Sequence, residues 1–432
     1  SLTLFGHRTP AAPPCVRTSS TQSSMCTPLA LLFLASTPSS GTGSTPATAR
    51  TKWSFTAASD KLNTPVVSPD GNTVFVGSDR DDMHVYALRT ADGQLRWAFN
   101  ASEMPCFQGY RGDISRLVMS QDGDVLYFGV GLCYFGVNAA DGSLTLSWNI
   151  APVEIVGAPV ISPDGQTLYA AFVSYAIKTI CALDLTLNKS IYAGTNDCRW
   201  THSTWVSEYS PPVVSPDGTL LYFGSEEGIA TALLTSNGTK KWGFQVYWRD
   251  VGRMVPSLDG ETVYFSRRGS TDYYALNASN GSKRWVYRYL ITSTAPVLSP
   301  DGRTVYIGVD GDGASVIGPD GRYHRANSTV VAVDATSGRA KWSFSTSSAV
   351  TGFAGPPVAS EAAVYFGSAL EGRMWSLDAS EGSEKFSINV SMSGSTWAFP
   401  QAALSPDAKT IFVVSASNDK CLYAFGTSIV AS

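Results

Sequence analysis

The chain has 432 residues and a formal net charge of −4 at pH 7, and only 15% of its residues are charged. This composition excludes a protein built around a basic nucleic-acid-binding surface. Long charge runs and heptad repeats are absent from the sequence, which argues against a coiled coil. Beyond residue 50 the sequence is too long for an ordinary single domain and indicates a structure that grows by repetition.

The first fifty residues are rich in Ser, Thr, Pro and Ala and have no strand period. An apolar run over 29–35 follows Met25, and a small-residue cleavage site lies at 47–49. The segment from Met25 therefore resembles a secretory signal peptide that lacks a basic start, the alternative being a leader without a targeting role. The run is too short to span a bilayer. We expect residues 1–50 to be a disordered leader, residues 51–429 to form the folded domain, and the protein to be secreted.

The rest of the sequence contains one segment that occurs eight times. Each copy has a short apolar strand, a turn of the Ser-Pro-Asp-Gly type, and an aromatic residue five positions after the Asp. One copy has Ser360 where the others have Asp. The turn and aromatic residues pair as Asp70/Phe75, Asp122/Tyr127, Asp164/Tyr169, Asp217/Tyr222, Asp259/Tyr264, Asp301/Tyr306, Ser360/Tyr365 and Asp407/Phe412.

Each copy contains four predicted strands. In the first copy they cover 65–67, 73–77, 85–88 and 95–99, which are rich in β-branched and aromatic residues and separated by turn signals. Successive aromatics of the repeat are 42 to 59 residues apart, as expected for four-stranded propeller blades and too far apart for the common helical repeats. The sequence therefore predicts an all-β fold, an eight-bladed β-propeller of four-stranded antiparallel blades.

The last copy ends after its third strand, at 420–425. A strand of the missing type lies at 51–55, ahead of the first blade, and its Trp-Ser-Phe sequence recurs at 342–344 in the sixth blade. We therefore expect the N-terminal strand to complete the last blade and to close the ring, because closure removes the strand edges that an open array would expose.

A second pattern links the third and fourth strands. Ala332 is followed by Gly338 six positions later and by Trp342 four positions after that, and three other copies repeat this spacing: Ala87/Gly93/Trp97, Ala232/Gly238/Trp242 and Ala275/Gly281/Trp285. The pattern resembles the tryptophan-docking motif of the pyrroloquinoline quinone (PQQ) enzyme repeat, in which an indole packs between adjacent blades. The chain is thereby identified as a member of the PQQ-like, or quinoprotein alcohol dehydrogenase-like, propeller family over essentially all of 51–429.

Four blades depart from the motif. Blade 2 is two residues longer, blade 3 is expected to have Tyr192 at the tryptophan position, and blade 7 has Phe386. Blade 8 is expected to use Trp53 from the N-terminal strand. Because buried aromatics supply large apolar contact areas, we expect the repeat tryptophans to pack between blades rather than to bind a ligand.

Insertions in the repeat point to a binding surface. The connections after Trp97, Tyr192 and Phe386 are long, and blade 6 has an insertion between its second and third strands. These connections open on one side of a propeller, here called the connection face, and long loops on a rigid scaffold commonly bind ligands. Aromatic and Arg side chains favour binding, although they also pin loops to a scaffold. The candidates are Arg111, Arg116, Arg199, Trp200, His202, Trp205, Glu208, Trp248, Arg249, Arg253, Tyr323, His324 and Trp397.

Two weaker signals favour export. Seven Asn-x-Ser/Thr sequons predict a glycoprotein, although Asn-Gly-Ser/Thr also makes good turns: Asn100, Asn188, Asn237, Asn277, Asn280, Asn327 and Asn389. Two disulfides are expected, Cys106 with Cys133 and Cys181 with Cys198, which leaves Cys421 as a buried thiol.

Two classes of function remain. For a quinoprotein dehydrogenase the resemblance implies PQQ, an adjacent Cys-Cys pair, calcium held by Glu, Asn and Asp, and an Asp base. The sequence has no adjacent Cys pair. Its three propeller histidines fall on separate blades, and the acidic turn at 310–313 lacks the later ligands of a calcium loop. We therefore expect a non-catalytic monomer without cofactor or metal, which binds a protein, peptide or glycan on the connection face. The alternative is a PQQ-dependent dehydrogenase with PQQ and calcium.

Overall fold

A computed structural model describes most of the chain beyond residue 50. It covers residues 16–18, 51–58, 61–104, 112–149, 154–155, 157–174, 177–186, 198–204, 210–246, 251–267, 272–288, 294–309, 315–317, 323–325, 329–346, 355–368, 373–389, 402–414 and 421–427. Helix in these segments is limited to the single 3₁₀ turn η1 (Ala101–Glu103), and none of it is long and apolar enough to cross a membrane.

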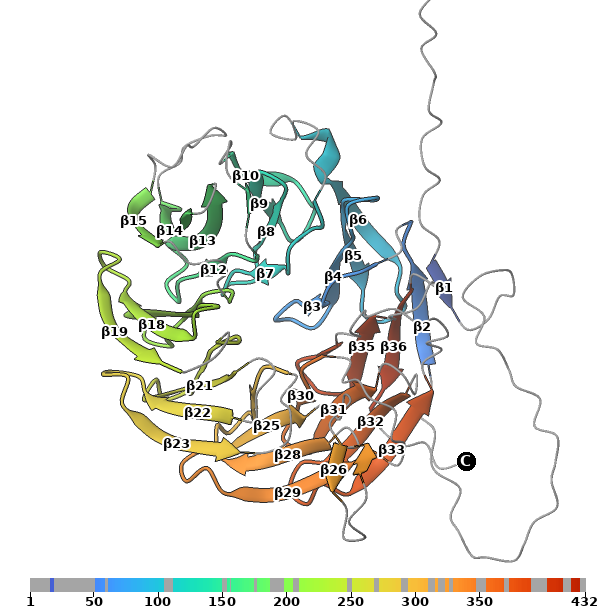
Figure 1. Ribbon diagram of the computed structural model, residues 1–432. Coiled ribbons are helices and arrows are strands. Elements are labelled where there is room, and N and C mark those ends of the chain that lie inside the picture. The colour runs from blue at the N-terminus through green and yellow to red at the C-terminus, as the bar shows by residue number, and fades with distance from the viewer. Residues whose placement is uncertain are drawn as a thin grey trace, which may run out of the picture.

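Eight antiparallel sheets stand around a ring (Figure 1), which confirms the predicted all-β, eight-bladed propeller. From the centre outward, blade 1 has β3 (Val66–Val67), β4 (Thr73–Gly77), β5 (His84–Arg89) and β6 (Leu95–Asn100). Blade 2 has β7 (Val118–Met119), β8 (Val125–Val130), β9 (Cys133–Asn138) and β10 (Leu144–Asn149). Blade 3 has β12 (Val160–Ile161), β13 (Thr167–Ser174), β14 (Ile177–Asp184) and β15 (Cys198–Thr204), with β11 (Glu154–Ile155) also on β13. Blade 4 has β16 (Val213–Val214), β17 (Leu220–Gly224), β18 (Ile229–Leu234) and β19 (Lys240–Gln245).

The second half of the ring repeats this order. Blade 5 has β20 (Val255–Pro256), β21 (Thr262–Ser266), β22 (Asp272–Asn277) and β23 (Lys283–Arg288). Blade 6 has β24 (Val297–Leu298), β25 (Thr304–Val309), β28 (Thr329–Asp334) and β29 (Ala340–Ser345), with the hairpin of β26 (Ser315–Ile317) and β27 (Tyr323–Arg325) between β25 and β28. Blade 7 has β30 (Val358–Ala359), β31 (Ala363–Ser368), β32 (Arg373–Asp378) and β33 (Glu384–Asn389).

Blade 8 closes the ring as the sequence predicts. Its inner strands are β34 (Ala402–Leu404), β35 (Thr410–Val414) and β36 (Cys421–Gly426), and β2 (Thr51–Thr56) is its fourth strand. Trp53 pairs with Ala424 and Phe55 with Leu422, and both aromatic side chains are buried. The outer edge of β2 pairs with β1 (Val16–Thr18), although no strand was expected in the leader. This is the outermost backbone edge of the blade, and such an edge readily accepts another strand.

The turn between the first and second strands follows from its sequence. In blade 5 the Ser257 hydroxyl donates to Asp259 Oδ1 at 2.5 Å, and the backbone N–H of Glu261 donates to the same oxygen at 3.0 Å. Gly260 has φ of 72°, a conformation that glycine adopts without steric cost. These turns and the short turns between third and fourth strands form one face of the disk, here called the turn face.

Indole rings join neighbouring blades near the turn face. The Trp342 Nε1–H of blade 6 donates to the Ala379 carbonyl of blade 7 at 3.0 Å. A Cβ at Gly382 would lie 2.4 Å from the Trp342 ring, so only glycine fits beneath it. Six indoles make this hydrogen bond at 2.6–3.1 Å, in the pairs Trp53/Thr90, Trp97/Ala139, Trp200/Thr235, Trp242/Ala278, Trp285/Ala335 and Trp342/Ala379.

Blade 3 differs from the expectation. Trp200, rather than Tyr192, has the tryptophan position, because it pairs with Ala182 as Trp242 pairs with Ala232 in blade 4. Ala182 and Trp200 are 18 positions apart, against 10 for Ala232 and Trp242. The additional residues thus belong to the connection between β14 and β15. That connection is on the turn face, so the prediction that this insertion decorates the connection face is wrong.

Blade 2 also differs from the expectation, because Leu146 rather than Trp148 pairs with Gly136 at the tryptophan position, ten positions away as in the other blades. The Trp148 indole is fully buried, yet its Nε1–H has no hydrogen-bond partner. Trp148 pairs with Tyr134, two positions from Gly136, so it does not have the place from which the other indoles reach the turn of the next blade. A buried donor without an acceptor costs free energy.

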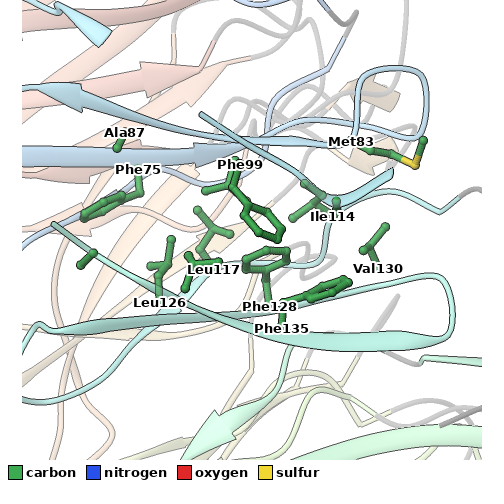
Figure 2. Close-up of a cluster of buried hydrophobic side chains, with 14 of the residues drawn as sticks. Phe75, Met83, Ala87, Phe99, Ile114, Leu117, Leu126, Phe128, Val130 and Phe135 are labelled. Carbon is green, nitrogen blue, oxygen red and sulfur yellow. The ribbon is translucent and has the colours of Figure 1, made fainter. Parts of the chain in front are cut away.

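The hydrophobic core lies between blades rather than at the centre of the disk. Between blades 1 and 2, the rings of Phe75, Phe99, Phe128 and Phe135 pack with aliphatic side chains, as Figure 2 shows. Phe99 contacts both Phe128 and Phe135, with ring centroids 5.8 Å apart in each pair. On the turn face a second set of contacts joins blades, since a Cβ at Gly123 would lie 2.9 Å from Pro69 of the preceding blade.

Closure by β2 makes a testable prediction. Phe55→Ala removes a fully buried ring and is expected to destabilise the protein by about 3–5 kcal/mol. Ser54→Ala, on the other face of the same strand, should change stability by less than about 0.5 kcal/mol. Chemical denaturation measures both. Equal effects of the two substitutions would contradict the closure.

The indole hydrogen bonds make a second prediction. Trp342→Phe and Trp148→Phe remove similar volumes, but only the first removes a hydrogen bond, and the Ala379 carbonyl then keeps only the long one from the Tyr306 hydroxyl at 3.4 Å. Trp342→Phe should therefore be more destabilising by about 1 kcal/mol. Thermal and urea unfolding of the two variants gives the comparison. A larger loss for Trp148→Phe would show that the buried indole N–H of blade 2 has a partner in solution.

Candidate functional site

A cavity of about 500 Å³ occupies the centre of the ring. Its walls are the innermost strands of the blades and the residues that directly precede them. Blades 1, 2, 5, 6, 7 and 8 contribute, through Asn63, Thr64, Arg116, Arg253, Val255, Ala295, Pro296, Val297, Leu298, Pro356, Val358 and Ala402. Because the chain enters each innermost strand from the connection face, the cavity lies toward that face.

Two of the predicted binding residues, Arg116 and Arg253, are brought together in this cavity. Each directly follows a residue whose backbone is hydrogen-bonded to the second strand of the same blade. Ser115 N–H donates to the Gly129 carbonyl at 2.8 Å, and Gly129 N–H donates to Ser115 Oγ at 2.9 Å. In blade 5, Gly252 N–H donates to the Ser266 carbonyl at 2.8 Å. The two arginines therefore have equivalent places in their blades.

The repeat shows that arginine is exceptional at this place. The equivalent residues are small or proline in five other blades and glutamine in blade 8: Thr64, Ala158, Pro211, Ala295, Pro356 and, in blade 8, Gln401, which Ala402 follows. In the five blades with a small residue or proline the next residue is proline, whereas Leu117 and Met254 follow the two arginines. Leu117 and Met254 are buried in inter-blade cores. Since side chains alternate along an extended chain, this anchoring directs Arg116 and Arg253 away from the cores and into the channel wall.

The charged side chains among the described residues of the cavity lining are all positive. None of the described residues that line the cavity carries a carboxylate. Within the described residues, neither the Arg116 nor the Arg253 guanidinium has a hydrogen bond or an ion pair. Water reaches Arg116 inside the channel, but the protein surrounds it, and this desolvation lowers the pKa of its guanidinium. On the outer surface, by contrast, Arg80 pairs with Asp113 and Arg89 with Asp92.

Asn63 ties the cavity wall together. Its amide Nδ2 donates to the carbonyls of Ile114 and Ser115, the latter at 3.1 Å. These bonds join blade 1 to blade 2 and fix the backbone immediately before Arg116. Neither hydrogen bond uses the Asn63 Oδ1 atom, which can accept one.

Three other candidates lie elsewhere. Arg199, Trp200 and His202 were expected in a loop of the connection face, but they belong to β15, the outermost strand of blade 3. Arg199 pairs with Asp184 at 2.8 Å, which lowers the pKa of that carboxyl to about 2. The His202 ring hydrogen-bonds the Gly238 carbonyl of blade 4 at 3.1 Å. These residues stabilise blade 3 and join it to blade 4. The prediction was wrong because it assigned the tryptophan position of blade 3 to Tyr192, eight residues before Trp200.

The remaining candidates lie either in the blade 6 hairpin or outside the described residues. Tyr323 and His324 lie in β27, in the blade 6 hairpin. Arg111, Trp205, Glu208, Trp248, Arg249 and Trp397 lie outside the described residues.

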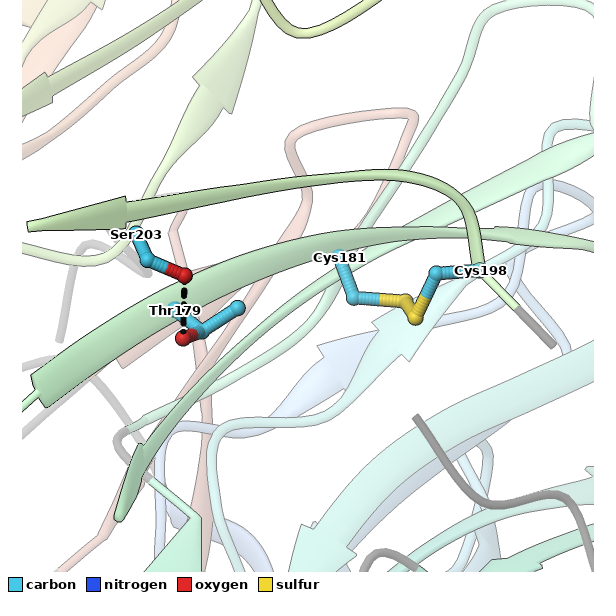
Figure 3. Close-up of a disulfide and its surroundings, with 4 residues drawn as sticks. All are labelled: Thr179, Cys181, Cys198 and Ser203. Atoms are coloured by element: carbon cyan, nitrogen blue, oxygen red, sulfur yellow. Dashed lines mark hydrogen bonds between the residues drawn. A yellow bond between two sulfur atoms is a disulfide. The ribbon is translucent and has the colours of Figure 1, made fainter. Parts of the chain in front are cut away.

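A disulfide joins Cys181 and Cys198, as expected, at the base of the long β14–β15 connection (Figure 3). Their Cα atoms are 5.6 Å apart. Cys133 and Cys421 are also disulfide-bonded. The expectation of a free thiol at Cys421 is therefore wrong, and Cys106, the expected partner of Cys133, lies outside the described residues.

A buried ionic cluster lies on the connection face of blade 1. Asp82 Oδ1 is 2.9 Å from His84 Nδ1, and the Tyr86 hydroxyl donates to Asp82 Oδ2 at 2.6 Å. Burial opposes protonation of His84, but the hydrogen bond and the negative charge of Asp82 outweigh it and raise the His84 pKa. Met83, between them, has φ of 51°, a conformation that is uncommon for a residue other than glycine.

The closed ring and its repeat define a class, the eight-bladed propellers of PQQ-like repeats. A family model described as outer membrane protein assembly factor BamB matches residues 30–244 and 190–427, and the chain belongs to this family. A search of curated proteins finds no matching sequence.

Solved structures share the fold at low identity. BamB from Moraxella catarrhalis is 16% identical with a TM-score of 0.60, over 88% of this chain and 99% of that one. A quinohemoprotein alcohol dehydrogenase from Pseudomonas putida HK5 is 14% identical with a TM-score of 0.62, over 90% and 77%. A europium-containing methanol dehydrogenase is 13% identical with a TM-score of 0.63, over 87% and 93%. These likenesses show the fold alone.

Among its described residues, the cavity lining has no carboxylate that could serve as the calcium ligand or the Asp base implied by the family resemblance. A cation that polarises a quinone needs oxygen ligands, and the proton transfer needs a base. The described lining offers two arginines, apolar groups and the side-chain oxygens of Asn63 and Thr64, and it offers no carboxylate base. In the part of the chain that the structure describes, no cluster of three His, Cys, Asp or Glu could hold a metal ion.

The His84 cluster predicts a pH dependence. Because the folded-state pKa of His84 is raised, its stabilising contribution is fully present below the ordinary histidine pKa of about 6.5 and is lost as the pH rises through the raised value. His84→Gln should therefore lower Tm more at about pH 5.5 than at about pH 8.5.

His202→Gln is a matched control with the opposite sign. Burial lowers the pKa of His202, so protonation in acid destabilises the fold and the glutamine should be tolerated better at low pH. Thermal melts of both variants at the two pH values provide the measurement. The same trend in both would contradict the role given to Asp82.

Proposed function

We propose that this protein is a non-catalytic, exported propeller that binds a protein or peptide partner at its central cavity and the surrounding connection face. The observation that carries this proposal is the cavity wall, where two arginines lie among mostly apolar and small residues and have neither an ion-pair partner nor a neighbouring carboxylate among the described residues. A pocket with apolar walls and a few converging polar groups is suited to ligand binding. Membership of a family named for an assembly factor supports a protein partner.

Catalysis by a bound quinone is the less favoured function. It is supported by the shared fold of two dehydrogenases, but fold does not determine activity. The sequence has no adjacent cysteine pair, and no acid lines the described cavity. The residues that the family resemblance would require therefore have no counterparts there.

Export is supported by covalent and surface features. The Cys181–Cys198 disulfide is typical of proteins that fold in an oxidising compartment. The sequon residues Asn237 and Asn280 are exposed, although each also caps a local turn. The printed family description, an outer membrane assembly factor, is consistent with a location outside the cytoplasm.

The enzymatic alternative is tested by reconstitution. Purified protein is loaded with PQQ and calcium, and reduction of an artificial electron acceptor is followed with alcohols and sugars. We expect no turnover above the background of the free cofactor. Turnover that is abolished by mutating a carboxylate on the connection face would overturn the proposal.

The binding proposal is tested by peptide selection. A random peptide library selected on the immobilised propeller should yield peptides that compete with one another for one site. Thr64→Trp, which fills the cavity wall, should abolish their binding. Thr336→Trp, on the exposed turn face, is the matched control and should leave it unchanged. Thermal melts verify that both variants fold, and loss of binding in both or in neither would contradict the site.

A further inference from the structure

We infer that the central cavity receives an acidic segment of the partner, whose carboxylates pair with Arg116 and Arg253. This inference rests on the proposed function and adds the chemistry of the ligand. Carboxylates match the planar, fork-like donors of a guanidinium, and such charge-assisted pairs are strong when water is excluded.

The first support is the imbalance of charge. The chain as a whole carries a net charge of −4, yet its cavity has two cations and no anion among the described lining residues. Several arginines outside the cavity are paired with carboxylates of the chain, as in Arg199 with Asp184 and Arg284 with Glu261. Arg116 is exposed to the channel and Arg253 is half-buried there, so both can be reached by a ligand carboxylate, which would supply the charge pairing that the described residues of the chain do not.

The second support is the preparation of the site. Five of the six other blades have a small residue or proline where blades 2 and 5 have arginine, and blade 8 has Gln401, so the repeat does not need arginine there in order to fold. Leu117 and Met254 anchor the strands beside the two arginines. The backbone hydrogen bonds at Ser115 and Gly252 fix the point from which each side chain leaves. A preorganised site loses little conformational entropy when a ligand binds.

The third support is the shape of the cavity. Its volume of about 500 Å³ lies within the range of roughly 300–1,000 Å³ that is usual for ligand pockets. Arg116 and Arg253 belong to blades three apart in a ring of eight, so they approach the centre from opposing sides. Adjacent side chains of an extended peptide point in opposite directions. Two neighbouring acidic residues of one segment can therefore reach both arginines, while the Asn63 Oδ1 atom can accept from the peptide backbone.

The test measures the binding of a labelled probe peptide by fluorescence anisotropy. The probe has two adjacent glutamates flanked by Gly and Ser, and a second peptide has glutamine at both places. We expect the glutamate peptide to bind the full-length protein at least about tenfold more tightly, as pairing of charged groups predicts. Raising the salt concentration should weaken this binding.

Two double variants locate the site. Arg116→Ala with Arg253→Ala introduces the residue that blade 6 has naturally at Ala295, and should weaken the glutamate peptide by at least about tenfold. Arg303→Ala with Arg339→Ala removes the same charge from exposed positions on the turn face and should leave the affinity unchanged. Equal binding of the two peptides, or equal losses in the two double variants, would overturn the inference.

A third arm distinguishes a peptide from a small anion. If citrate or free PQQ binds at the arginines and the glutamate peptide does not, the cavity is an anion site of another kind and the inference fails. The proposed function is tested separately from this acidic chemistry. If the selected peptides, whatever their charge, require Thr64 but bind the Arg116→Ala/Arg253→Ala protein normally, the partner site at the cavity is supported and its acidic chemistry is overturned.

Discussion

The ring depends on the contact between an indole of one blade and a glycine of the next. At Gly382 there is no room for a Cβ beneath the Trp342 ring, and the indole N–H is satisfied by a carbonyl of the same turn. Two residue types at a fixed spacing thus set both the distance and the orientation between blades. The contacts of turn prolines with turn glycines act at the same face. Apart from the long β14–β15 connection of blade 3, the turn face is consequently constrained in sequence, while the connection face is free to vary, and the cavity opens toward the face that can vary.

The sequence predicts the scaffold well because the scaffold repeats. Eight copies of one turn and aromatic identify the blades, and the resemblance of β2 to other fourth strands identifies the closure. The error in blade 3 has a physical cause. Counting ten positions from Ala182 assumes that the β14–β15 connection keeps its length, and only the pairing of Ala182 with Trp200 shows otherwise. The prediction of a free thiol at Cys421 was wrong because this cysteine is disulfide-bonded, and the sequence alone does not show which cysteines lie close together in space.

The candidate site was only partly accessible from the sequence. Arg116 and Arg253 were selected as loop arginines among many, and nothing in that reasoning separated them from Arg199, which braces a strand. The signal was nevertheless present. When the blades are aligned on their innermost strands, the two arginines occupy one column, and the proline that follows in five other blades is replaced by Leu117 and Met254. A position that departs from a structural repeat is a candidate for a functional role, because folding alone would be satisfied by the residue that the other copies have.

Closure by β2 also sets the order in which the molecule can fold. Trp53 emerges early from the ribosome, but its partner Ala424 follows 371 positions later. At about 5–20 residues per second of synthesis, β2 remains without its sheet for roughly 20–75 s. During that interval Trp53 and Phe55 form an exposed apolar strand with two open edges, the type of segment that pairs with the wrong chain. The final step of folding is the docking of the first strand, and a helper that shields this strand until blade 8 is complete would protect the whole ring.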